Sequence, residues 1–188
     1  MQNNVSKTRI IVECALLIAM GTILAQVKIF RMPSGGSVTL LSMVPFIMIS
    51  FRHGSKWGFL AGLANVALQI ALGGIYTPPA GTILALIGSI LLDYVLAYLV
   101  LAFADLFSKP FKNRPVGIAI ATAIVCFFRF ICAFLSGFII WGSLADGIWP
   151  AVIYSLGYNA AYMVPETILT VIAIYILAKK APQLFKNK

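Results

Sequence analysis

Long apolar runs, separated by short polar connections, restrict this chain to very few kinds of fold. Of its 188 residues, 61% are hydrophobic and 10% are charged, and the mean hydropathy is +0.99. An apolar run of roughly 20 residues can cross a bilayer as a helix, whereas a membrane β-barrel alternates in units of about ten residues. The runs here are continuous, so the sequence predicts an all-α polytopic membrane protein, with residues 1–188 forming one transmembrane domain.

Six apolar segments can be drawn, and six is the predicted number of transmembrane helices. The second segment is short and contains Pro45, so we expect it to be tilted, bent or partly embedded. The segments span about 8–28, 37–51, 55–76, 80–107, 115–141 and 150–178.

Lysine and arginine residues gather on one side of this layout. One side receives only Lys28 and Arg31. Because cytoplasmic connections carry the excess of basic residues, both termini are predicted to lie in the cytoplasm. This distribution also accounts for the net charge of +9 without a nucleic-acid partner. The eleven basic residues on the other side are Lys7, Arg9, Arg52, Lys56, Lys109, Lys112, Arg114, Lys179, Lys180, Lys186 and Lys188.

The last apolar segment carries a polar stripe that lipid contact does not require. On a helix, Ser155, Asn159, Tyr162 and Glu166 lie at i, i+4, i+7 and i+11, on one narrow face. Such a face must contact protein or a cavity rather than lipid. Two interpretations stay open: hydrogen bonding between helices, or one wall of a small-molecule site. Pro165, inside the segment, should kink the helix.

Three charged residues lie deep in apolar segments: Asp93, Arg129 and Glu166. A charge at that depth costs several kcal/mol, roughly 2.5 or more, unless it is paired or hydrated, and it marks a functional site by default. Asp93 can pair with Arg129, and Glu166 can equally be the partner of Arg129. The sequence does not choose between these pairings.

The residues for covalent chemistry are missing from this sequence. The only histidine, His53, lies in a basic cytoplasmic turn, so we expect no metal site, no cofactor and no enzymatic activity. The sequence has no phosphate-binding loop of the GxxxxGK[ST] type, so the chain should not hydrolyse ATP. Recognition and movement of a solute is the expected function. Five residues of the outer half suit a flat, cationic, heteroaromatic solute: Asp93, Trp141, Tyr154, Tyr158 and Asn159.

Two further features carry functional hypotheses. The connection Arg31–Ser37 is rich in glycine and fits either a lid or an ordinary loop. Ala15 and Ala19 are small residues one helical turn apart, which lets another helix approach closely. That helix belongs either to this chain or to a partner.

Several short motifs along the chain belong together: Gly35–Val38, Ser50–Gly54, Leu92–Tyr94, Arg129 with Ser136 and Gly137, and Tyr154–Leu156 followed by Asn159. The chain with these motifs resembles one known family, the thiamine-specific substrate-binding subunits (S-components) of bacterial energy-coupling factor vitamin transporters. The resemblance covers nearly the whole chain, and its most specific part is the tyrosine and the asparagine five residues apart.

The resemblance implies a six-helix S-component fold in the bacterial cell membrane, with a thiamine site near the outer face. Asp93 is expected to bind the aminopyrimidine ring of thiamine. Ala15 and Ala19 match the family's contact with a transmembrane T-component, which works with two ATPases. The other expected ligand contacts are Tyr76, Tyr94, Arg129, Trp141, Tyr154 and Asn159.

Two departures from the family pattern leave the ligand open. Family members often carry a histidine where this chain has Ala133, and some carry a tryptophan near the position of Gly36. A thiamine precursor or a related pyrimidine is therefore an alternative ligand. A proton-coupled secondary transporter, with Asp93 or Glu166 as proton carrier, is the alternative from another class. It is disfavoured because no internal repeat is visible.

Overall fold

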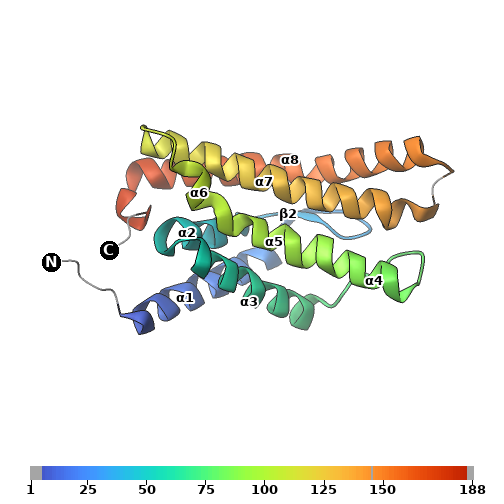
Figure 1. Cartoon of the computed structure of the whole chain (residues 1–188), viewed down its shortest axis with the longest axis horizontal. Helices are drawn as coiled ribbons and strands as arrows, with labels where there is room; N and C mark the ends of the chain where they lie inside the picture. The colour runs from blue at the N-terminus through green and yellow to red at the C-terminus, as the bar shows by residue number, and fades with distance from the viewer. Residues whose placement is uncertain (1–5, 145, 186–188) are drawn as a thin grey trace.

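The computed structural model describes residues 6–144 and 146–185, and its regular structure is mostly helical (Figure 1). Lys186 and Lys188, which entered the basic-residue count, lie outside the described residues. In chain order the elements are α1 (Lys7–Gln26), β1 (Lys28–Arg31), β2 (Ser37–Thr39), α2 (Met43–His53), α3 (Ser55–Gly73), α4 (Ile83–Ser89), η1 (Ile90–Leu96), α5 (Ala97–Leu99), η2 (Val100–Phe103), α6 (Ala104–Ser108), α7 (Arg114–Ile139), η3 (Trp141–Leu144), α8 (Ile148–Lys180) and η4 (Pro182–Phe185).

In the part of the chain that the structure describes, four helices are long and apolar enough to cross a membrane: α1, the continuous helix Ile83–Ser108, α7 and α8. The predicted second segment differs from these, because it begins as strand β2 and continues as α2. With 11 residues, α2 is only about 16 Å long. It is buried from Met43 to Phe51, so it packs as an internal helix. The count of six spans stays a prediction.

A two-stranded hairpin is the one departure from the predicted all-α class among the described residues. Strands β1 and β2 pair antiparallel, with Phe30 opposite Val38 and an irregularity between Lys28 and Phe30. Gly35 and Gly36 lie in its turn with φ of 94° and 78°, which glycine adopts without steric strain. The glycine-rich connection is therefore an ordered hairpin turn.

The helix Ile83–Ser108 changes its winding along its length. A π-helical turn, η1, follows α4, and the 3₁₀ turn η2 follows α5. π-helical turns are rare and occur frequently at functional sites. Asp93 lies within η1.

The core is built around α2, which contacts α1, α3, α6, α8 and η4. Met43 and Ile47 on α2 are fully buried, and Phe51 contacts Phe185 of η4 with ring centroids 5.8 Å apart. This packing joins the C-terminal η4 to the middle of the bundle. It leaves α1 at the periphery, with only Cys14 and Gly21 buried.

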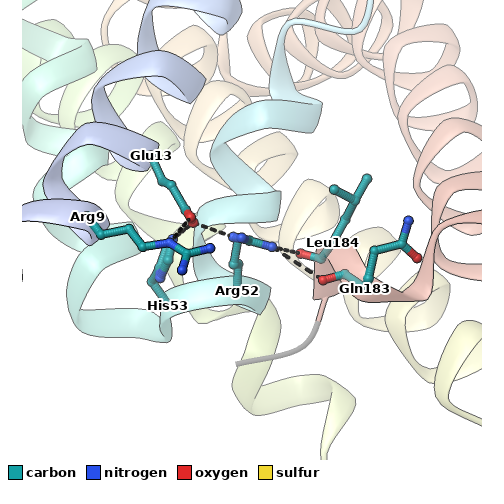
Figure 2. A network of polar contacts seen from close by, with 6 residues as sticks. All are labelled: Arg9, Glu13, Arg52, His53, Gln183 and Leu184. Atoms are coloured by element: carbon teal, nitrogen blue, oxygen red, sulfur yellow. Dashed lines mark hydrogen bonds and ion pairs between the residues drawn. The ribbon is translucent and has the colours of Figure 1, made fainter. Parts of the chain in front are cut away.

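Polar contacts join α1, α2 and η4 at one end of the bundle (Figure 2). The Glu13 carboxylate lies 2.6 Å from Arg52 Nε, 3.0 Å from Arg9 Nε and 3.1 Å from His53 Nε2. Arg52 also donates to the Gln183 and Leu184 carbonyls, at 3.3 and 3.4 Å. The network fixes this end of the bundle.

Candidate functional site

A cavity of about 410 Å³ lies between the hairpin and the helices α3, α7 and α8. Residues from the end of α1, from η1 and from η3 complete its wall. The sequence predicted seven ligand contacts, and every one lines this cavity: Tyr76, Asp93, Tyr94, Arg129, Trp141, Tyr154 and Asn159. Residues spread over more than eighty positions of the chain thus meet at one site.

Hydroxyl groups hold the Asp93 carboxylate in the cavity wall. Its Oδ2 accepts hydrogen bonds from Ser136 at 2.6 Å and from Ser89 at 2.9 Å. Among the described residues, no cation forms an ion pair with Asp93. Within the described part of the chain, Asp93 therefore has hydroxyl partners but no cationic partner.

Arg129 and Glu166 do not pair either with each other or with Asp93. Arg129 donates from Nη2 to the Tyr98 hydroxyl at 3.2 Å, and its guanidinium carbon lies 4.1 Å from the Tyr98 ring centroid. Glu166 accepts hydrogen bonds from Thr39. Both pairings left open by the sequence are thus absent among the described residues, and each of the three charged side chains has its own partners.

The polar stripe of α8 joins α8 to α7 and also lines the cavity. Ser155 donates to the Phe134 carbonyl at 2.7 Å, and Asn159 Nδ2 donates to the Ala133 carbonyl at 3.2 Å. The Asn159 Oδ1 accepts from Tyr162 at 2.9 Å. The interpretation as hydrogen bonding between helices is therefore confirmed, and the stripe also lines the cavity. That the cavity holds a small molecule stays a prediction. In this structure, the Asn159 amide bonds to protein groups through both of its polar ends.

Aromatic side chains form much of the remaining wall. The Tyr94 hydroxyl accepts from the Tyr76 backbone N–H at 3.2 Å. Tyr154 lies beside Tyr158, with ring centroids 5.6 Å apart. These rings offer flat apolar surfaces with electron-rich faces, which attract a planar cation.

Pro165, which was predicted to kink the last helix, lies inside α8. This helix continues without a break from Ile148 to Lys180.

The hairpin forms one side of the cavity, and its two basic residues were not predicted from the sequence as site residues. Lys28 and Arg31 line the cavity, and burial together with the nearby charge of Arg31 lowers the pKa of Lys28. Tyr158 accepts from the Ser34 backbone N–H and donates to the Gly35 carbonyl, both at 2.8 Å. Tyr158 was predicted to lie near the ligand, but no sequence pattern predicts its contact with the hairpin turn.

Comparison with known proteins shows which family the chain belongs to. The family model described as "Thiamine transporter protein (Thia_YuaJ)" matches residues 11–186. The chain belongs to this family. The resemblance drawn from short motifs is therefore confirmed, and the chain is a multi-pass membrane protein of bacterial type.

Individual members of the thiamine transporter family align along most of the chain. "Thiamine transporter ThiT" of Bacillus subtilis (strain 168) is 33% identical over 188 residues, covering 94% of each chain. "Thiamine transporter ThiT" of Lacticaseibacillus paracasei is 26% identical over 160 residues, covering 78% of this chain and 75% of the relative. A solved structure of ThiT from Listeria monocytogenes is 26% identical, with a TM-score of 0.76, and covers 95% of this chain and 98% of its own.

In this member of the family, Ala15 and Ala19 lie away from the cavity. Both are exposed on α1, among the apolar residues Ile11, Leu16 and Ile23, whose exposed fractions are 55%, 65% and 66%. The two alanines therefore do not pack inside this chain, which was one of the two interpretations. The other, contact with a partner helix, stays a prediction.

Proposed function

We propose that the chain is a thiamine-binding S-component that captures thiamine in the cavity around Asp93. All seven predicted contacts line one cavity, and this observation carries the proposal. Asp93, the acid among them, has no cationic partner among the described residues. Membership of the thiamine transporter family supports the choice of ligand.

The residues around the cavity match the chemistry of thiamine. Its amino-substituted pyrimidine can donate to the Asp93 carboxylate, which Ser89 and Ser136 hold in place. Its thiazolium ring is a flat cation, which the faces of Tyr94 and Trp141 suit. In this arrangement the acid selects the amino group, and the aromatic rings select a planar cation.

The proposed transport step depends on other proteins. We infer that a T-component and two ATPases supply the energy, because the chain has no phosphate-binding loop of its own. The Lys and Arg distribution supports six membrane segments with both termini in the cytoplasm, within a single domain of residues 1–188. The cavity then lies in the outer half of the bundle, where thiamine enters.

Purification of the chain alone, followed by mass spectrometry of the small molecule that accompanies it, tests the proposal. Recovery of thiamine is the expected result. Recovery of a pyrimidine precursor would reassign the ligand, since Ala133 replaces the family's histidine. Uptake into vesicles tests the energy source: uptake driven by a proton gradient without ATPase subunits would replace the S-component by a proton-coupled transporter.

A further inference from the structure

Glu166 makes a two-point contact with the hairpin. Its Oε2 accepts the backbone N–H of Thr39 and its Oε1 accepts the Thr39 hydroxyl, both at 2.5 Å. The Ser42 hydroxyl lies 2.6 Å from the Thr39 hydroxyl and 3.4 Å from Oε1. Glu166 is 4% exposed and Thr39 is 6% exposed. Both carboxylate oxygens therefore bind the protein itself.

Thr39 occupies the junction between the hairpin and the core. It is the last residue of β2, and α2 begins at Met43. Between them Leu41 has a φ of 63°, a left-handed conformation that is uncommon for a residue other than glycine. Residues in such conformations persist when their surroundings fix them. The Glu166 contact lies within two residues of this corner and fixes its direction.

A second contact holds the other end of the hairpin to the same helix. Tyr158 bonds Ser34 and Gly35 in the turn, and Glu166 follows Tyr158 by eight residues on α8. Positions eight apart lie on the same side of a helix. The hairpin is thus fixed along α8 at both its turn and its base, across the cavity that it lines.

We propose that Glu166 is a positioning residue that controls how long the cavity retains its ligand, by fixing the base of the hairpin. The proposal rests on thiamine binding in the cavity. A carboxylate suits this role because it presents two acceptors to two donors of one residue. Its removal leaves the buried Thr39 N–H without a partner, which favours opening of the hairpin.

The first measurement needs no ligand, so it is independent of the proposed function. Hydrogen–deuterium exchange of the purified, ligand-free chain should be faster at residues 28–42 in Glu166→Ala, by about tenfold or more. Thr39→Val should give a smaller increase, because it removes only the hydroxyl contact. Glu166→Gln should preserve most of the protection, since an amide can accept the N–H and donate to the hydroxyl.

Thr170→Val is the matched control. Thr170 is buried on α8 one turn beyond Glu166, and its hydroxyl has no hydrogen-bond partner among the described residues. Unchanged exchange at residues 28–42 is expected in this variant. Equal acceleration in Thr170→Val and Glu166→Ala would mean general loosening of α8 and would overturn the proposal.

The second measurement is the rate of thiamine release, followed by tryptophan fluorescence. Glu166→Ala should release thiamine about tenfold faster or more, and Glu166→Gln should stay close to the unmodified chain. Unchanged release despite faster hairpin exchange would overturn the retention role. If Glu166→Ala does not fold, Thr39→Val decides in the same two assays. Absence of thiamine binding to the unmodified chain would instead contradict the proposed function, with the exchange result unaffected.

Discussion

The Asp93 side chain is partly buried and also lines the cavity. Its position in the π-helical turn η1 places the carboxylate against Ser89 and Ser136, whose hydroxyl groups stabilise the charge without neutralising it. The sequence predicted a functional role for Asp93, because an acid at this depth in a membrane helix is energetically costly and marks a functional site by default. Ser89 lies one turn before Asp93 on the same helix, as the sequence indicates. The sequence did not reveal Ser136 as the second partner, since hydroxyl contacts between helices follow no spacing rule.

Asp93→Asn is expected to weaken thiamine binding by about 1.5–3 kcal/mol, because a hydrogen bond to a charged group is lost in a desolvated site. Titration followed by tryptophan fluorescence measures the change. Asp105→Asn is the control, since Asp105 lies at the end of the same helix and contacts Lys109 at 3.9 Å, away from the cavity. Equal affinity for thiamine in Asp93→Asn and in the unmodified chain would show that Asp93 does not bind the ligand.

Ala133 is the position at which the chain departs from its family. It lines the cavity, is 7% exposed, and its carbonyl accepts from Asn159. We expect Ala133→His to weaken thiamine binding, because overpacking a formed site typically costs about 1–3 kcal/mol. Calorimetric titration checks this. Tighter binding would show that the histidine is a lost ligand contact.

At the scale of elements, the apolar runs predicted the long helices well, because their length and hydropathy depend on local sequence. The hairpin was not predicted, and α2 (Met43–His53) covers only the later part of the predicted short segment 37–51. Strands β1 and β2 contain only 4 and 3 residues, and their placement depends on Tyr158 and Glu166, more than a hundred residues later. Contacts between residues so far apart produce no periodic pattern of residue types in the sequence.

The contact between α7 and α8 depends on a glycine. A Cβ on Gly137 would lie 2.8 Å from Asn159 Nδ2, and closer still to the Ser155 hydroxyl. Gly137→Ala should therefore push α8 from α7, with a loss of about 1–3 kcal/mol in stability and weaker binding. Thermal unfolding in detergent measures the first effect.

Gly157→Ala is the control for this substitution, because a Cβ there meets nothing within 4 Å. It should leave stability unchanged or raise it slightly, since alanine favours helix more than glycine does. Similar melting temperatures for Gly137→Ala and Gly157→Ala would refute the close contact between α7 and α8.

At the scale of the whole molecule, the cavity and the exposed face of α1 are separate. Ala15→Trp and Ala19→Trp should retain thiamine binding but lose co-purification with the T-component, because a large ring blocks close approach of another helix. Pull-down assays and uptake measure the two effects. Ile172→Trp, at a 52% exposed position on α8, is the control. Retained co-purification in both alanine variants would place the docking face elsewhere.

Only part of the molecular arrangement could be predicted from the sequence. Residue types, depth and the family resemblance together indicated the cavity side chains, and the basic residues indicated an orientation. The separation of Asp93, Arg129 and Glu166 into three environments was not predictable, because several pairings satisfied the same pattern. Only the packing of the helix Ile83–Ser108, α7, α8 and the hairpin decides among them.

A structure of the purified chain with bound thiamine would show directly whether the cavity around Asp93 is the ligand site. We expect thiamine in the cavity, with its aminopyrimidine within hydrogen-bonding distance of Asp93 and its rings against Tyr94, Trp141 or Tyr154. Thiamine bound outside this cavity, or bound inside it with no contact to Asp93, would contradict the proposed site.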